Sequence, residues 1–167
     1  MFDACSTIYL TKINIKEKLP SLGELVISKA VIKESTADLD KFKEAQTIKS
    51  NIDKKIFKKS IVTIKNQFSS KNLGKGEKEV IEICSKSYSI PVTDDQKAFH
   101  FALSIGLKPK TSEIILLNLL EENIIDYDEF KEFFYELAEI KLIKPDIITF
   151  FKKKAKIIIE NQHVKEE

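Results

Sequence analysis

Three aspartates directly follow apolar segments of the sequence. Asp3 comes after a two-residue apolar start, and Asp94 and Asp95 come after the apolar segment at residues 89–93. Segments of this kind predict buried strands of a parallel sheet. In open sheets the ligand crevice lies beyond the carboxyl ends of the strands, so we expect the three carboxylates at one edge of the sheet.

Two glutamates are expected to reach the same edge from helices. Glu34 lies on a short predicted helix after residues 24–28, and Glu77 opens the helix that follows the glycine-containing segment at residues 73–76. Crowded carboxylates repel one another unless a divalent cation neutralises them. Mg²⁺ and Mn²⁺ prefer such oxygen ligands, activate water and stabilise phosphoryl charge. The sequence therefore predicts a metal site whose ligands are also the catalytic residues: Asp3, Glu34, Glu77, Asp94 and Asp95.

The segments that must position these acids alternate between strand and helix patterns, which is typical of a parallel sheet covered by helices. Strands are predicted at residues 24–28, 61–64 and 89–93, and one long lysine-rich amphipathic helix at residues 38–59. Further helices are predicted at residues 98–105 and 114–120, around residues 130–140, and from Pro145 onward. We expect an α/β fold, a three-layer α/β/α sandwich with a central parallel sheet and a helical C-terminal extension.

No internal repeat or flexible linker divides the 167 residues, a length that suits one globular domain. We expect residues 1–167 to form a single domain with residues 126–167 packed on it as helices. Cys5 and Cys84 form no CxxC pair and are expected to be buried thiols, which favours a cytoplasmic location. The apolar runs are too short to span a bilayer, so no membrane partner is expected.

The charges exclude a strong overall attraction to polyanions, because 28 basic residues nearly balance 26 acidic ones. Every one of those basic residues is a lysine, so bidentate arginine clamps on phosphate are absent from the chain. Binding of a polyanion must come from local lysines beside the acids. We expect this role for Lys71, Lys75, Lys78 and Lys97, whereas Glu79 and Glu82 are predicted to be solvated.

Several motifs resemble those of one known family, the PIN domain. Residues 73–81, LGKGEKEVI, and residues 90–98, IPVTDDQKA, are similar to a subgroup that pairs "LGxGE" with a "DDxxA" strand end. The opening DACSTIYLTK at residues 3–12 resembles the family's Asp-x-x-Ser/Thr start, and VIKES at residues 31–35 resembles its helix with an acidic ligand. The resemblance covers nearly the whole chain.

The resemblance implies a divalent-metal-dependent endoribonuclease that hydrolyses RNA phosphodiester bonds, with Mg²⁺ or Mn²⁺ held by the acids named above. It implies that Ser6 hydrogen-bonds within the site, that the chain forms homodimers, and that it is the toxin of a toxin–antitoxin pair, like the VapC-like members of the family. RNA and an antitoxin protein are then the expected partners.

Two other interpretations of the acids stay open. A catalytically inactive PIN-like module could bind nucleic acid or protein through the same fold, because fold does not fix activity. A phospho-acceptor signalling domain also keeps acids and Mg²⁺ at strand ends, but it carries its acidic pair after the first strand. Here the pair Asp94 and Asp95 comes late in the chain, which favours the nuclease.

Overall fold

The computed structural model describes residues 1–62, 64–65 and 73–166, with side chains up to residue 162. The chain divides into two compact units, Met1–Ser112 and Glu113–Glu167. The single domain expected from the sequence stays a prediction, and the two units are described separately below. Among the described residues, no helix is both long and apolar enough to cross a membrane.

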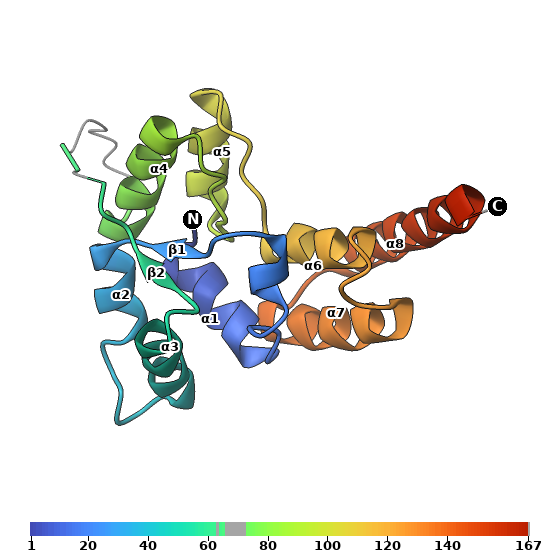
Figure 1. Ribbon diagram of the computed structural model, residues 1–167, viewed down its shortest axis with the longest axis horizontal. Helices are drawn as coiled ribbons and strands as arrows, with labels where there is room; N and C mark the ends of the chain where they lie inside the picture. The colour runs from blue at the N-terminus through green and yellow to red at the C-terminus, as the bar shows by residue number, and fades with distance from the viewer. Residues whose placement is uncertain (63, 66–72, 167) are drawn as a thin grey trace. The chain divides into compact units, whose positions relative to one another are not determined.

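The first unit is built around a short run of parallel strand pairings (Figure 1). Strand β1 (Val26–Ile27) pairs in parallel with β2 (Lys58–Lys59), so that Val26 lies opposite Lys58. Single-residue parallel bridges extend this pairing from β1 to Phe2, from Phe2 to Val92, and from Val92 to Lys110. The order across the pairings is therefore β2, β1, Phe2, Val92 and Lys110.

The order in which successive segments of the chain join the sheet reverses direction between Phe2 and Val92. From Phe2 the chain moves outward to β1 and β2, whereas Val92 and Lys110 lie on the other side. The Asp3 N–H donates to the Val92 carbonyl at 3.0 Å, and the Val92 N–H donates to the Met1 carbonyl at 2.7 Å. Such a reversal point opens a crevice beyond the carboxyl ends of the strands. The all-parallel pairing fits the predicted α/β class, while the three-layer sandwich stays a prediction.

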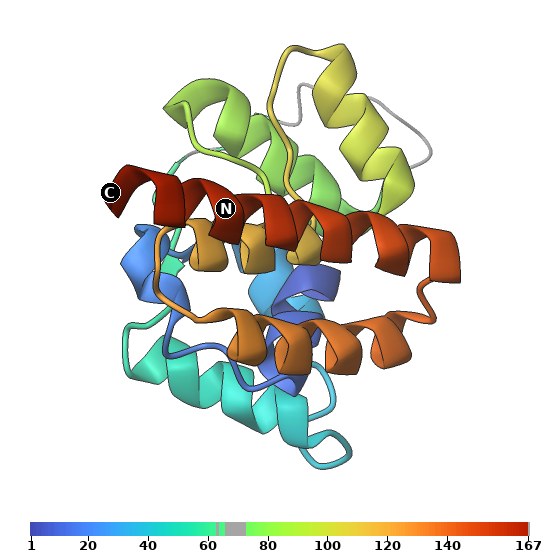
Figure 2. The ribbon, with the colours of Figure 1, turned by 90° about the vertical axis from the view of Figure 1, so that its right-hand side faces the viewer.

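Helices flank these pairings on two sides (Figures 1 and 2). In Figure 1, α4 and α5 lie above the strands and α1 and α3 lie below them, and Figure 2 likewise shows α4 and α5 above α1 and α3. The core between them includes Phe2, Ile27 and Val92, all of which are buried. The helical elements of this unit are α1 (Ala4–Lys12), the short 3-10 helix η1 (Leu19–Leu22), α2 (Lys29–Ser35), α3 (Lys43–Asp53), α4 (Lys75–Ser87) and α5 (Gln96–Ser104).

The long helix predicted at residues 38–59 is wrong, because α3 spans only Lys43–Asp53. The chain turns at Lys55, whose φ is +60°. The N–H groups of Ile56 and Phe57 then both donate to the Asn51 carbonyl, at 2.9 and 3.3 Å. This turn reverses the chain and leads it into β2. Lysine-rich helical spacing continues past the turn, so periodicity alone misplaces the end of the helix.

The strand predicted at residues 61–64 is also wrong for the residues described there, since pairing occurs earlier, at Lys58–Lys59. Buried Phe57 packs edge-on against Phe2, with ring centroids 5.9 Å apart, and this contact sets the register. The Lys58 N–H then donates to the Leu25 carbonyl at 2.8 Å. Ile61 is 97% exposed, so its apolar character does not mark a buried strand.

The second unit consists of helices: α6 (Ser112–Glu121), α7 (Tyr127–Lys141) and α8 (Pro145–Glu166). Phe130 and Phe134 stack with centroids 5.5 Å apart, and Phe151 of α8 packs against Phe134 at 5.6 Å. A largely buried ion pair joins Glu113 to Lys141 at 2.5 Å. The helix predicted around residues 130–140 is confirmed as α7, and its residues Phe130 and Phe134 are buried.

Candidate active site

Asp3 is fixed at the reversal point of the sheet by two hydrogen bonds. It is the N-cap of α1, where its Oδ1 accepts from the Ser6 backbone N–H at 2.8 Å. Its Oδ2 accepts from the Thr93 hydroxyl at 2.5 Å, so residues 90 apart in sequence meet here. The carboxylate is only 1% exposed. Burial raises the pKa of Asp3 to about 6, although the Thr93 bond favours the charged form.

Asp94 and Asp95 come shortly after Val92, the bridge position beside Phe2. The two aspartates make different hydrogen bonds. Both oxygens of Asp94 accept from Ser112, one from the backbone N–H at 3.0 Å and the other from the hydroxyl. The Oδ1 of Asp95 accepts from the Ala98 N–H at 2.8 Å and caps α5. No described residue donates to the second oxygen of Asp95, so that atom is free for a ligand.

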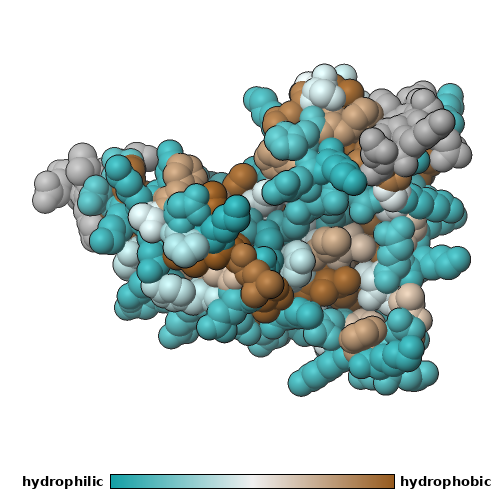
Figure 3. Space-filling view, turned by 180° about the vertical axis from the view of Figure 1, so that it is seen from behind, coloured by the Kyte–Doolittle hydropathy of each residue, from teal (hydrophilic) through white to brown (hydrophobic). Residues whose placement is uncertain are grey.

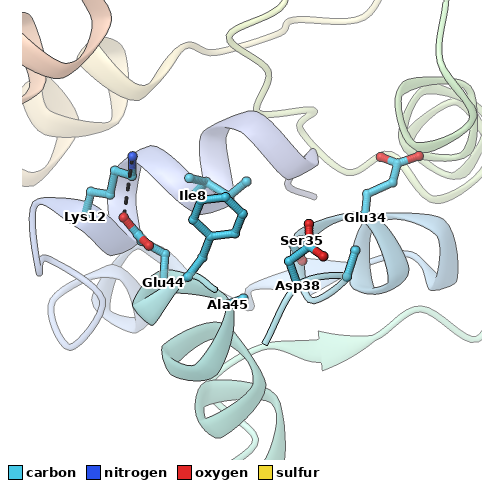
Figure 4. Close-up of a pocket in the computed structure, with 9 residues that line it drawn as sticks. Ile8, Lys12, Glu34, Ser35, Asp38, Glu44 and Ala45 are labelled. Atoms are coloured by element: carbon cyan, nitrogen blue, oxygen red, sulfur yellow. Dashed lines mark ion pairs between the residues drawn. The ribbon is translucent and has the colours of Figure 1, made fainter. Parts of the chain in front are cut away.

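Glu34 approaches the start of α4 closely, and a glycine permits this approach. Its Oε1 accepts from the Gly76 N–H at 3.1 Å. A Cβ at position 76 would lie 2.3 Å from Glu34 Oε2, which is far below van der Waals distance. Figure 4 shows Glu34 at the end of a pocket of about 230 Å³, its carboxylate pointing away from the Lys12–Glu44 ion pair. The Gly74-x-Gly76 segment thus shapes the site.

Glu77 contributes an oxygen that is buried but unbonded. No described residue donates a hydrogen bond to its Oε2. A Cβ at Gly74 would lie 2.2 Å from this same oxygen, so the carboxylate folds back over a second glycine. Buried polar atoms nearly always have a partner, and one without a partner requires an explanation. Ser6 is buried too; its backbone N–H bonds to Asp3, and its side chain helps to limit the rise in the pKa of that carboxyl.

Two neighbouring groups feel the negative charge of the acids. Desolvation and nearby negative charge raise the pKa of the Cys5 thiol to about 11. The acids that act on it are Asp3, Glu77, Asp94 and Asp95. The pKa of Glu34 is also raised, by burial and then by the charges of Glu77 and Glu79. Glu77 is common to both sets of charges.

Four of the five acids have no lysine partner among the described residues. Asp3, Glu34, Glu77 and Asp95 form no ion pair with any lysine of the part of the chain that the structure describes. Within that part, no three acidic, cysteine or histidine side chains are grouped tightly enough to hold a metal ion as they stand. The donor set fits Mg²⁺ or Mn²⁺ in chemistry, and one buried oxygen of the set, Glu77 Oε2, has no donor among the described residues.

A family model described as PIN domain matches residues 1–156 of the chain. The chain belongs to the PIN-domain family. Comparisons with curated proteins and with solved structures gave no match. The resemblance inferred from the motifs is confirmed at the level of the family, and the PIN domain is a nuclease-type fold. Membership of the VapC-like subtype stays a prediction.

Three other residues of this PIN domain differ in burial from the sequence predictions. Glu79 and Glu82, predicted to be solvated, are buried. Glu79 Oε2 accepts from the Ala30 N–H at 2.9 Å, and Glu82 pairs with Lys86 at 2.5 Å. Cys84 is buried as expected, but Cys5 is exposed. The spacing of the two glutamates along α4 does not predict their burial. Their burial depends on other segments, whose backbone N–H groups bond to both of them.

The predicted substrate lysines occupy varied positions. Lys75 and Lys97 are exposed, and Lys78 is partly buried on the first turns of α4. Lys75 acts electrostatically on Glu34, which places it beside the acids. Lys71 lies outside the described residues. An RNA-binding role for these lysines stays a prediction.

Proposed function

We propose that this PIN domain is a divalent-metal-dependent endoribonuclease that hydrolyses phosphodiester bonds of RNA. The observation that carries the proposal is Asp3, held at the reversal point of a parallel sheet by Ser6 and Thr93, with Glu77, Asp94 and Asp95 near enough to act on the adjacent Cys5 thiol. Uncompensated carboxylates at such an edge are suited to binding a cation. The proposed site residues are Asp3, Glu34, Glu77, Asp94 and Asp95.

The roles of the acids follow from their bonds. Asp3 is held on both oxygens by Ser6 and Thr93, so it serves as the fixed ligand. Asp95 offers its unbonded oxygen, and Glu77 offers a buried oxygen that lacks any described donor. Glu34 completes the set from α2, held in place through the Gly76 N–H. Closing this set around Mg²⁺ or Mn²⁺ requires the side chains of the two glutamates to move, because the acids are not grouped tightly enough as they stand.

When bound, the metal supplies an activated water at neutral pH and stabilises charge on the phosphoryl group. The chain's own contribution is to position that chemistry. Thr93 keeps Asp3 ionised against the effect of its burial, because its hydroxyl hydrogen-bonds to the charged form. Lys75, beside Glu34, can attract a phosphate as a point charge, since the chain has no arginine.

The test is cleavage of single-stranded RNA with Mg²⁺ or Mn²⁺, compared with cleavage in excess EDTA. We expect fragments only with the metals. Binding of the same RNA in Ca²⁺, measured by fluorescence anisotropy, separates recognition from chemistry. Equal cleavage in EDTA would refute the metal requirement.

One observation favours the second candidate, an inactive PIN-like module that binds nucleic acid or protein. No tight group of three metal-binding side chains exists among the described residues as they stand. That candidate predicts RNA or protein binding in Ca²⁺ with no cleavage under any metal. Titration calorimetry with Mn²⁺ supplies the decisive measurement, because an inactive module without a metal site gives no binding heat.

The toxin role, the antitoxin and the homodimer belong to the same proposal. Exposed apolar side chains of the second unit, including Leu142, Ile147 and Phe150, provide surface that a second copy could cover. On the face shown in Figure 3, such hydrophobic patches are interrupted by hydrophilic side chains. Light scattering that gives a monomer mass at every concentration would rule out the homodimer. Growth arrest on expression, relieved by the product of an adjacent gene, would support the toxin.

A further inference from the structure

Helices α2 and α4 run antiparallel along one groove of the first unit. Two hydrogen bonds establish their direction. The Ala30 N–H, near the start of α2, donates to Glu79 on the second turn of α4 at 2.9 Å, whereas Glu34, near the end of α2, accepts from Gly76 at the start of α4. One end of the groove therefore lies at Glu34, which belongs to the candidate active site, and the other end leads away from it.

The groove is lined by lysines that have no acidic partner among the described residues. It encloses about 850 Å³ and is lined by Lys29, Lys33 and Lys75 together with small side chains and two glutamates. All three lysines are exposed, and none forms an ion pair with any residue that the structure describes. Glu79 is buried and bonded to the Ala30 N–H, which leaves Glu34 at the catalytic end as the remaining acid.

The spacing of the two α2 lysines follows from helix geometry. Lys29 and Lys33 are four residues apart, so they lie on the same face of α2, separated by about 6 Å along its axis. Glu34 follows Lys33 directly. Adjacent residues point about 100° apart around a helix, but Lys29, Lys33 and Glu34 all line the same groove. Lys29 therefore lies farther than Lys33 from Glu34 along α2.

We propose that this groove is a phosphate-binding subsite, in which Lys29 and Lys33 hold backbone phosphates of the RNA strand outside the catalytic carboxylates. The proposal rests on the proposed ribonuclease function and extends it to RNA phosphates beyond the one that is cleaved. A strand whose scissile phosphate lies at Glu34 must leave the site along some surface. The α2–α4 groove begins at that residue and offers unpaired cations, which favour a polyanion.

The lining favours nucleic-acid phosphates over an acidic protein segment. Protein partners usually insert large apolar anchors into fitted pockets. The only apolar side chains that line this groove among the described residues are those of Ala30 and Ala37, which form no such pocket. Lysines act as point charges and recognise phosphate without reading bases. The subsite should therefore add affinity without adding sequence specificity.

The experiment is a salt titration of RNA affinity in Ca²⁺ on the full-length chain. Each lost phosphate contact lowers the single-strand salt slope by about 0.7, so Lys29→Gln/Lys33→Gln should flatten it by about 1.4. The matched control is Lys49→Gln/Lys54→Gln, which removes the same charge from exposed lysines on and just after α3. The control should leave the slope nearly unchanged. Equal flattening in both variants would overturn the subsite and leave only a general charge effect.

A second measurement separates this inference from the proposed function. With Mg²⁺, Lys29→Gln/Lys33→Gln should raise KM for a long oligonucleotide several-fold, with kcat unchanged, and should leave a very short oligonucleotide unaffected. If the wild type does not cleave, the Ca²⁺ titration still tests the groove. Unchanged RNA affinity together with weakened binding of a polyglutamate peptide would show that the groove binds acidic protein instead. Matching thermal unfolding of both variants confirms that they fold.

Discussion

The acids of the candidate site fall into two groups that are held in opposite ways. Asp3, Asp94 and Asp95 follow strand positions and accept hydrogen bonds from Ser6, Thr93, Ser112 and Ala98. Glu34 and Glu77 come from helices and accept few bonds: Glu34 accepts from Gly76, and one buried oxygen of Glu77 has no described donor. The strand group is fixed in place, while the helix group can adjust.

This difference matters for how the site would bind a cation. Fixed carboxylates define where the metal lies, and movable carboxylates can shorten their distance to it when it arrives. The glycines at 74 and 76 leave room for the carboxylates of the helix group, since a Cβ at either position would collide with a glutamate oxygen. The predictions below test the two groups separately, beginning with the fixed one.

Asp3→Asn should cause the largest effect, a loss of metal-dependent cleavage on the order of 10³-fold. The substitution keeps the shape of the side chain but removes the charge of the most fixed ligand. Initial rates with saturating Mn²⁺ provide the measurement. The control is Asp38→Asn, which changes an exposed acid outside the set and should retain full activity. If Asp3→Asn cleaves as fast as the wild type, the strand group does not bind the metal.

The same residue should make the metal-free protein less stable as the pH rises. The folded-state pKa of Asp3, about 6, lies above its ordinary value of 3.8. Its contribution is therefore fully present below about pH 4 and is lost as the pH rises through about 6. The loss amounts to about 3 kcal/mol in the free energy of unfolding.

Urea unfolding of the wild type and of Asp3→Asn in EDTA, between pH 4 and pH 7, measures this loss. The variant should show a flatter profile and exceed the wild type in stability near neutral pH. Saturating Mg²⁺ should restore the stability of the wild type but not change that of the variant. A wild-type profile parallel to that of the variant would contradict the burial-induced shift.

Gly76→Ala tests the adjustable group. The added Cβ would displace Glu34, whose Oε2 would lie 2.3 Å away, and activity should fall about 10–100-fold. Alanine is favoured over glycine inside a helix by roughly 0.5–1 kcal/mol, so the thermal midpoint should stay the same or rise. Glu34→Gln should reproduce the loss of activity. Full activity in Gly76→Ala would show that the position of Glu34 is unimportant.

Thr93→Val should produce the smallest effect. It removes the 2.5 Å hydrogen bond to Asp3 Oδ2, which favours the charged carboxylate, so the pKa of Asp3 should rise further. The acidic limb of the pH–rate profile should then move upward by less than about one pH unit. Thr93→Ser, which keeps the hydroxyl, should leave the profile in place. A shift of equal size in both variants would point to packing rather than to the hydrogen bond.

The strand group can be located from the sequence because it depends on local pattern. Asp94 and Asp95 follow an apolar segment, and the pattern after residue 28 predicts a helix that ends near residues 35–36, where α2 does end. Asp3 is both a helix cap and a member of the acidic set, so a capping pattern does not exclude a site role. The fold class is likewise evident from alternating segments.

The helix group and its surroundings depend on long-range contacts that no local pattern shows. Glu79 is buried because it bonds to Ala30, 49 residues away, although its spacing on α4 resembles that of solvated glutamates. The end of α3 depends on a left-handed residue, Lys55, which has no glycine or proline to mark it. The collision of a Cβ at Gly76 with Glu34 is visible only when both helices are in place.

The bond between Asp94 and Ser112 has a consequence for observing the site. Ser112 is the first residue of α6, and the first amides of a helix have no partner within the helix. Its N–H is bonded instead to Asp94 at 3.0 Å. A cation that drew this carboxylate away would leave the buried amide without its acceptor. The rate of hydrogen–deuterium exchange at one backbone position would then report on occupancy of the carboxylate cluster without any label in the cluster.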